Sequence, residues 1–398
     1  MTALQVTKKT FPWIAACSAV TLSTLSISVT SSSATPCFVR GFQLSRRLAA
    51  KSKRQLPPPQ QLNYRPFSQL AASTMDPEPF ATLRFVDIGA NLLDERFTQG
   101  VYHDKKRHEP DFHEVVKRAE IVGVKHIIMT AGTIEESAKA VEYVRKLRRA
   151  ELSTSSTNVH FSCTVGVHPT RCQQEFVDSE TPDEDLLQRL LQIAQDGMTD
   201  GSVVAVGEFG LDYDRLGFCP KDVQHKYFVK QLQVLAANTG LPLFLNNRSV
   251  GSDLYDLLKE HRECWKKGGV VHSFDDTHEL AMKFIDDLGL YIGLNGCSLR
   301  TEENLQVVKQ LPLENILLET DCPYCEVKRT HPGHQFVKTQ FQTKQEKKFE
   351  MGVMVKGRHE PCQIIQVAEV IAGVKGVPLQ TVSDTCFQSS LSLYGWDK

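Results

Sequence analysis

Polar side chains of the kinds that bind divalent cations recur along this 398-residue chain. Each comes at or just after a short apolar run that has the composition of a buried strand. Carboxylate, imidazole and amide groups together are ligands for Mg²⁺, Mn²⁺ or Zn²⁺ rather than for a thiolate-bound metal. The pattern therefore predicts a metal-dependent hydrolase. The residues are Asp87, Asn91, His168, Glu208, Asn246, His272, Asn295 and Asp321.

Eight apolar runs fit strands, and longer segments between them fit helices. Segments 111–124, 222–240 and 360–376 carry apolar residues at helical spacing, and Gly123, Gly240 and Gly376 fit helix ends. Apolar strands that alternate with crossover helices predict a parallel sheet covered on both faces. The strands are expected at 84–88, 126–131, 160–166, 203–208, 242–246, 269–274, 290–295 and 315–321.

The strand ends decide between two α/β architectures. An open doubly wound sheet would spread eight strand ends widely, whereas a closed (β/α)8 barrel brings all of them to one face. Because the polar residues fit one shared site, we predict a (β/α)8 TIM barrel over residues 81–398. A single His or Asp at a strand end is more often structural, and Asn295, between Gly293 and Gly296, also fits a turn.

The first 80 residues differ in composition from the rest. Up to Thr74 there are nine Lys and Arg and no Asp or Glu, whereas the remainder has 37 basic and 47 acidic residues. A basic, Ser- and Thr-rich leader is typical of a targeting segment, although a secretory signal or a disordered extension stays open. We expect a mitochondrial or other organellar location if the leader is used, and a cytoplasmic or nuclear one if translation starts at Met75. The acidic remainder predicts no general nucleic-acid-binding surface, and no membrane span is expected.

Two cysteine patterns suggest other chemistries. Cys322-Pro-Tyr-Cys325 has the spacing of a redox dithiol, and Cys322, Cys325, His331 and His334 have zinc-ligand types. A redox Cys-x-x-Cys works at the start of a helix, but the residues after Cys325 show no helical period. The spacer between the Cys and His pairs is short for a zinc finger. Neither pattern is favoured, and eleven scattered cysteines indicate buried thiols in a reducing compartment.

Seven motifs together resemble the TatD family of metal-dependent deoxyribonucleases, most nearly its eukaryotic branch. They occur in order from about Arg84 to Trp396, so that only the leader lies outside the resemblance. The resemblance implies a (β/α)8 barrel, two divalent cations and DNase activity, often in the 3′ to 5′ direction. The motifs are FVDIGANL (85–92), TVGVHPTRC (164–172), VVAVGEFGLDYDRL (203–216), GGVVHSFDD (268–276), YIGLNGCSLRTEENL (291–305), LLETDCPYC (317–325) and KGRHEPC (356–362).

The resemblance also implies roles for matching residues. Glu208 would bridge both metals, His272 would bind one of them, and Asp321 would bind metal and orient the attacking water. Further metal ligands would be Asp87, Asn91 and Asn246, and the expected substrate-binding residues are His168, which matches a phosphate-pocket motif, Arg248, Arg215 and Asn295.

The chain departs from the family at the fifth strand. The family has Phe-Leu-His-x-Arg there, with the His as a metal ligand, whereas this chain has Asn246, Asn247 and Arg248. His359 stands where the family usually has Asn. Because an amide is a weaker donor than imidazole for Zn²⁺, Asn246 predicts reduced affinity at one metal position and a preference for Mg²⁺ or Mn²⁺.

Together these features predict a two-metal 3′-5′ exonuclease that acts on DNA ends or single strands. We expect it to contact the phosphate backbone without sequence readout. Asp212 and Arg215, three residues apart, can equally pair with each other. Two alternatives stay open: a barrel hydrolase of a small molecule, and a catalytically weakened DNA-binding homologue, because of Asn246. The sequence does not indicate the oligomeric state.

Overall fold

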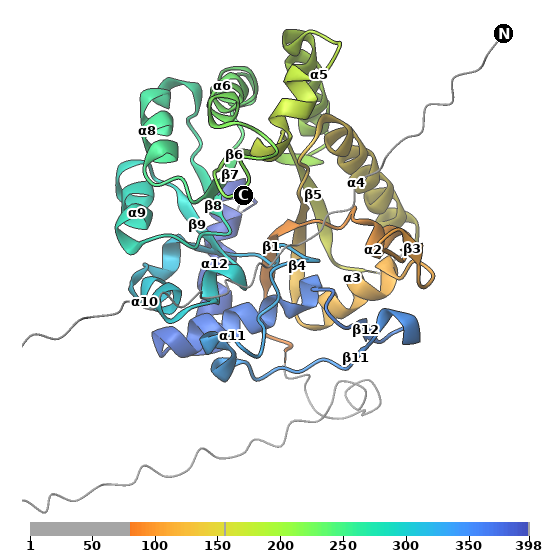
Figure 1. Ribbon diagram of the computed structural model, residues 1–398. Coiled ribbons are helices and arrows are strands. Elements are labelled where there is room, and N and C mark those ends of the chain that lie inside the picture. Colours follow the sequence, from red (N-terminus) through yellow and green to blue (C-terminus); the bar gives the residue numbers. More distant parts are fainter. Residues whose placement is uncertain (1–79, 155–156, 397–398) are drawn as a thin grey trace, which may run out of the picture. The chain divides into compact units, whose positions relative to one another are not determined.

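The computed structural model describes residues 80–154 and 157–396 (Figure 1). The predicted leader lies outside these residues except for Phe80. Eight parallel strands form one sheet in chain order, and a parallel bridge between Ala90 and Cys322 brings the last strand back to the first. The predicted (β/α)8 barrel is confirmed. The strands are β1 (Phe85–Ala90), β4 (Val124–Met129), β5 (His160–Val165), β6 (Val203–Asp212), β7 (Leu243–Arg248), β8 (Gly269–His272), β9 (Tyr291–Leu294) and β10 (Ile316–Leu318).

The strands occur where the apolar runs place them, but several ends differ. β6 is longer than predicted and continues past Glu208 to Asp212. β10 is shorter and ends at Leu318, so that the predicted eighth strand leaves the sheet before Asp321. Asp321 has a φ of +50°, which turns the chain sharply at that point.

Helices form a ring around the strands (Figure 1). The predicted helix at 222–240 is interrupted by a π turn at Leu232–Ala236, and the one at 360–376 begins with a 3₁₀ turn at Pro361–Gln363. Gly240 and Gly376 have left-handed conformations at helix ends, as predicted. The helices are α2 (Glu95–Thr98), α3 (Phe112–Ile121), α4 (Ile134–Thr154), α5 (Asp183–Thr199), α6 (Lys221–Gln231), α7 (Ala237–Thr239), α8 (Asp253–Glu260), α9 (His278–Met282), α10 (Glu302–Gln310), α11 (Ile364–Lys375) and α12 (Leu379–Tyr394).

None of the described helices alone is long and apolar enough to cross a membrane. Two consecutive segments, Pro361–Lys375 and Leu379–Tyr394, together have sufficient length and apolar composition, with a bend of 113° between them. Both segments are largely buried in the fold.

The apolar core has two parts, one on each side of the sheet. The larger part lies between the strands and the surrounding helices. The smaller part fills the barrel and includes Val86, Ile88 and Leu317 from the strands with Phe387 and Tyr394 from α12. α12 therefore closes the barrel at the end where the strands begin. The opposite end, where the strands finish, is left to polar residues.

The segment between β10 and α11 crosses the molecule beside α3. It contains two short parallel strands, β11 (Thr343–Lys344) and β12 (Met354–Val355), and a second small pair, β2 (Val101–Tyr102) and β3 (Lys105–Lys106), follows β1. Buried Arg358 donates to Asp111 and Glu360, and Arg118 of α3 donates to Glu360. These paired charges attach the segment to α3 and support the loop above it.

Candidate metal and active site

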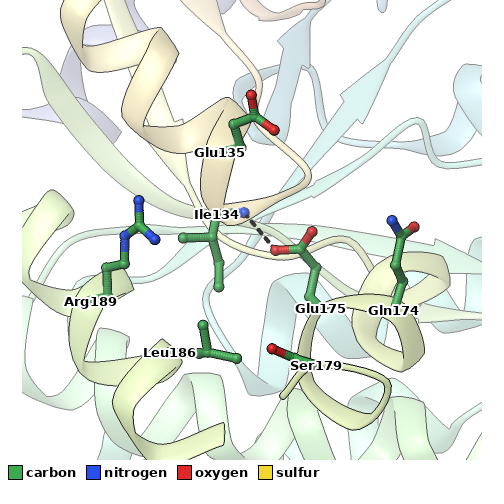
Figure 2. A pocket seen from close by; sticks show the side chains of 7 residues that line it. All are labelled: Ile134, Glu135, Gln174, Glu175, Ser179, Leu186 and Arg189. Atoms are coloured by element: carbon green, nitrogen blue, oxygen red, sulfur yellow. Dashed lines mark hydrogen bonds between the residues drawn. The ribbon is translucent and has the colours of Figure 1, made fainter. Parts of the chain in front are cut away.

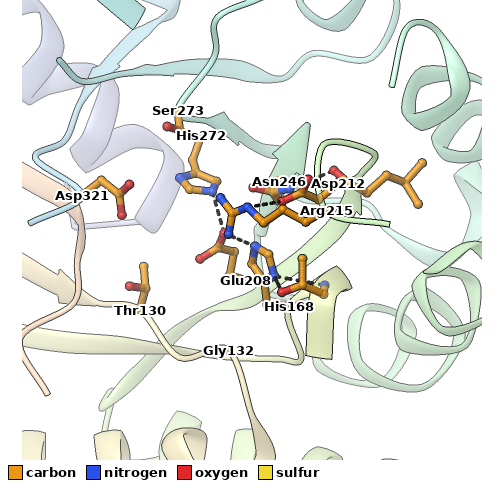
Figure 3. A network of polar contacts seen from close by, with 12 residues as sticks. Thr130, Gly132, His168, Glu208, Asp212, Arg215, Asn246, His272, Ser273 and Asp321 are labelled. Atoms are coloured by element: carbon orange, nitrogen blue, oxygen red, sulfur yellow. Dashed lines mark hydrogen bonds and ion pairs between the residues drawn. The ribbon is translucent and has the colours of Figure 1, made fainter. Parts of the chain in front are cut away.

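The end of the barrel where the strands finish forms a rim of polar residues. The carboxylate of Glu208 lies between two histidine rings at the centre of this rim (Figure 3). The Nε2 atoms of His272 and His168 are 2.9 and 3.3 Å from Glu208 Oε1. Glu208 belongs to β6, His272 ends β8, and His168 follows β5. Three strands thus bring three of the predicted site residues together, which the closed barrel makes possible.

Glu208 and His272 stabilise each other's charges, and His168 adds to the effect on Glu208. Burial alone would raise the pKa of Glu208, but the two histidines outweigh it and hold this pKa well below its usual value. Burial opposes the protonation of His272, yet the carboxylates of Glu208 and Glu319 raise its pKa well above the ordinary value. The rim therefore presents an ionised carboxylate at neutral pH.

Asp321 faces the same space from the turn after β10 (Figure 3). Its Oδ1 accepts a hydrogen bond of 2.8 Å from Asn91 Nδ2, and its Oδ2 accepts one of 3.1 Å from the Cys325 thiol. Asn91 Oδ1 accepts from Thr130 Oγ1 at 2.7 Å. Burial raises the pKa of Asp321 to about 6, although His272 acts in the opposite direction. The carboxylate is oriented through both oxygens, and Asn91 links the ends of β1, β4 and β10.

Glu319 is a site residue that the sequence analysis missed. Its carboxylate is fully buried, and Oε1 accepts from the Ser273 backbone N–H and from Asn295 Nδ2. Oε2 has no hydrogen-bond partner among the described residues and lies 3.5 Å from His272 Nδ1. A Cβ at Gly89 would come within 2.9 Å of Oε2, so glycine leaves room for the carboxylate. Strand alternation from Leu317, which faces the barrel interior, could have indicated Glu319.

The structure gives Asp87 and Asn295 supporting positions. Asp87 is fully buried, and its two oxygens accept from the backbone N–H and the hydroxyl of Thr320 at 2.9 and 2.6 Å. Burial raises the pKa of Asp87 to about 8. Asn295 is also fully buried, and its amide donates to Ser273 and Glu319 while its Oδ1 accepts from the Cys297 N–H. Both residues thus hold neighbouring segments at this end of the barrel together, and metal binding by Asp87 and substrate contact by Asn295 stay predictions.

Asn246 lies at the rim beside His272. The two residues are paired in register between β7 and β8, and Asn246 is 7% exposed. Its Nδ2 donates to the carbonyl of Leu211 at 2.8 Å. This bond fixes the amide orientation and directs Oδ1 away from that carbonyl. Asn246 can therefore offer an oxygen donor where a histidine would offer nitrogen.

The two predicted phosphate-binding arginines are both paired with carboxylates. Arg248 Nη1 lies 3.0 Å from Asp275 Oδ2, which Arg300 also approaches at 3.4 Å. Arg215 Nε lies 3.2 Å from buried Asp212 Oδ2, so the pairing that the sequence left open does occur. The Arg215 side chain is 38% exposed, compared with 17% for Arg248. Arg215 is the more accessible to a phosphate.

His359 supports the turn that carries Asp321. Its Nδ1 lies 3.0 Å from the carbonyl of Thr320 and 2.8 Å from that of Tyr324. Because both partners are acceptors, Nδ1 must carry the proton. Burial lowers the pKa of His359 to about 4, which keeps the ring neutral. His359 thus ties together the two sides of the turn that carries Asp321.

A separate pocket lies beside the start of α4 (Figure 2). Glu175 accepts from the Ile134 N–H there at 3.1 Å, and no predicted site residue lines the pocket. Its two carboxylates would oppose a phosphate. The lining residues are Ile134, Glu135, Gln174, Glu175, Ser179, Leu186 and Arg189.

The donor types at the rim fit a hard or borderline divalent cation. Glu208, Asp321 and Asn246 offer oxygen, and His272 and His168 offer nitrogen. Within residues 80–154 and 157–396, no three His, Cys, Asp or Glu side chains have the spacing of a ready metal site. At the rim, both imidazoles contact the same oxygen of Glu208. A cation held by these three side chains would replace the two contacts.

The barrel and its rim of carboxylate and imidazole groups define the class: a (β/α)8 hydrolase of the metal-dependent kind. The sequence model described as "TatD related DNase" matches residues 86–395. The chain belongs to this family, which confirms the resemblance.

Relatives agree with this assignment. The "Deoxyribonuclease Tat-D" of Schizosaccharomyces pombe is 43% identical over 78% of this chain and 96% of its own length. The "3'-5' ssDNA/RNA exonuclease TatD" of Cronobacter sakazakii is 31% identical over 60% of this chain and 78% of its own. A crystal structure described as a hydrolase TatD family protein from Entamoeba histolytica superposes with a TM-score of 0.70 at 36% identity, covering 78% of this chain and 98% of that one.

Proposed function

We propose that this protein is a metal-dependent deoxyribonuclease that removes nucleotides from the 3′ ends of DNA, with single strands preferred, using two divalent cations. The observation that carries the proposal is the meeting of Glu208, His272 and Asp321 at one rim in a member of this family. The exonuclease direction is drawn from the bacterial relative's name.

The chain's own groups divide the work of phosphodiester hydrolysis. Glu208, Asp321, His272 and Asn246 would hold the cations, which when bound lower the pKa of water and neutralise charge on phosphoryl oxygens. Asp321 accepts the proton of the attacking water, and its fixed orientation suits that role.

His168 and Arg215, at the edge of the site, are the groups expected to bind phosphate. His168 contacts Glu208 through Nε2 and Thr170 through Nδ1 at 2.8 Å, so its ring is held at the rim. Arg215 keeps more than a third of its side chain exposed. Such contacts to phosphate position DNA without sequence readout.

The decisive experiment follows a 5′-labelled single-stranded oligonucleotide with Mg²⁺ or Mn²⁺ and with EDTA. A ladder that shortens from the 3′ end and disappears with EDTA is expected. Phosphorothioate linkages at the 3′ end should slow it, whereas the same linkages at the 5′ end should not. Immediate release of the labelled mononucleotide would contradict the direction. DNA binding without shortening, even with added Mn²⁺, would instead favour the weakened homologue.

A further inference from the structure

Cys297 and Cys325 bring two thiols together at the edge of the rim. Cys297 follows β9, Cys325 follows the Asp321 turn, and their Sγ atoms are 2.9 Å apart. Both residues are partly exposed, whereas the other seven cysteines in the described part of the chain are buried. The two thiols are therefore close to each other, in the two cysteines of the described residues that are not fully buried.

The backbone holds this approach in place. A Cβ at Gly296 would come within 2.0 Å of the carbonyl oxygen of Cys325, so the two loops are in backbone contact beside the sulfurs. The Cys297 N–H donates to Asn295 Oδ1 at 2.8 Å, which fixes the first loop. A disulfide has an S–S distance near 2.05 Å, so the sulfurs need to approach by only about 0.9 Å.

We propose that Cys297 and Cys325 are a reversible oxidation site, which closes to a disulfide when a peroxide is the oxidant. One thiolate attacks the peroxide, so that the O–O bond breaks, an S–O bond forms and hydroxide leaves. The other thiolate attacks this sulfur, an S–S bond forms, the S–O bond breaks and a second hydroxide leaves. The two thiol protons convert both hydroxides to water, and two electrons pass from sulfur to the peroxide.

The pairing differs from the Cys-x-x-Cys pattern in the sequence. Cys322 is fully buried, and its backbone bonds to Asn91 and Thr320. Its side chain belongs to the apolar core, whereas Cys325 points to the loop after β9. Cys325 therefore pairs with Cys297, 28 residues away in sequence, and not with Cys322 as the motif suggests.

Oxidation would act on Asp321 directly. The Cys325 thiol donates to Asp321 Oδ2 at 3.1 Å, and a disulfide sulfur has no proton to donate. Closing the bond therefore removes one of the two donors that orient this carboxylate. If Asp321 acts as in the proposed function, on which this consequence rests, turnover falls roughly tenfold to a hundredfold. Reduction by dithiothreitol restores it.

Peptide mapping tests the site without reference to activity. The full-length reduced chain is treated with increasing hydrogen peroxide, alkylated under denaturing conditions and digested with trypsin without reduction. We expect segments 284–300 and 310–328 to become linked through Cys297 and Cys325, with Cys322 alkylated in the same product. Free Cys297 and Cys325 at peroxide concentrations that oxidise other cysteines would overturn the assignment, as would a Cys322–Cys325 bond.

Two variants separate the site from general oxidation. Cys297→Ser should lose both the linked peptide and the peroxide sensitivity of turnover, whereas Cys264→Ser, near α8, should keep both. A linked enzyme that retains full turnover would overturn the proposed effect on Asp321. Absence of nuclease activity in the fully reduced protein would count against the proposed function alone, because the linked peptide is identified by mass.

Discussion

Two pairs of histidines lie at opposite ends of the same barrel and have different surroundings. At the end where the strands finish, His168 and His272 both contact Glu208. At the end where they begin, the ring of His126 stacks between His160 and Trp396, with centroid distances of 5.1 and 4.4 Å. The first pair meets a carboxylate, and the second meets aromatic rings.

The difference shows how neighbours, rather than residue type, decide what a histidine does. The carboxylates around His272 raise its pKa against the effect of burial. Burial lowers the pKa of His126 to about 4, and His160 adds to that effect. The rim therefore holds charge for chemistry, whereas at the opposite end of the barrel, its base, the His126 ring stays neutral at neutral pH and packs against aromatic rings. This separation is what a barrel allows, because its two ends are built from different ends of the same strands.

Removing the carboxylate from the rim should give the largest effect. In Glu208→Gln the amide keeps the shape but loses the charge that both histidines contact, and it is a poor bridging ligand. We expect DNA hydrolysis with Mn²⁺ to fall by roughly a hundredfold or more, comparable to removal of a key electrostatic group in other enzymes. The matched change at the base, His126→Gln, should leave turnover unchanged. Equal losses in the two variants would contradict the division between the ends.

The alternation of apolar runs was enough to predict a parallel sheet covered on both faces, because each strand is buried on both sides. The polar residues at the strand ends then indicated a closed barrel. Convergence of Glu208, His272 and His168 followed from closure alone. Closure did not predict the direction of each side chain. Asp87 lies on the face of β1 opposite to Val86 and Ile88, which fill the barrel. That choice depends on the strand register.

Contacts between distant segments were also beyond the sequence. Glu319 acquires its position from groups that directly follow β8 and β9, and Cys297 meets Cys325 through two loops that touch. Arg248 and Arg300 share Asp275, a pairing that no local spacing indicates. The targeting role of the leader falls outside the described residues and stays a prediction.

Protonation of His126, at the end of the barrel where the strands begin, should lower the free energy of unfolding in mild acid. His126 has a folded pKa of about 4 against an ordinary value of 6.5, so the unfolded chain binds more protons between these pH values. Its contribution is complete above pH 6.5 and is lost as the pH falls toward 4, by up to about 1.4 kcal/mol per pH unit. Urea unfolding of the native chain and of His126→Gln at several pH values measures it. The variant should show a shallower loss, and exposed His103→Gln should match the native chain; parallel curves for all three would disprove the account.

Asn246→His should raise the affinity of the rim for Zn²⁺. Replacing the amide oxygen with imidazole nitrogen favours Zn²⁺, and we expect affinity at one metal position to rise by about tenfold for Zn²⁺, with a smaller change for Mg²⁺. Calorimetric titration of the native chain and the variant measures the shift, and turnover with each cation accompanies it. Identical binding curves and identical turnover would show that position 246 does not contact metal.

The smallest effect is expected from removing one of two tyrosine hydroxyls, which lie at opposite ends of the barrel. Tyr394 is buried in the base, and its hydroxyl has no hydrogen-bond partner among the residues described, whereas the Tyr213 hydroxyl, in the loop after β6, donates to Asp253 at 2.6 Å. A buried hydroxyl without a partner costs free energy that removal recovers. Tyr394→Phe should therefore raise the free energy of unfolding by about 0.5–1 kcal/mol, while Tyr213→Phe should lower it by about 1 kcal/mol. Urea unfolding at neutral pH measures both, and a destabilised Tyr394→Phe would mean that the base uses this hydroxyl after all.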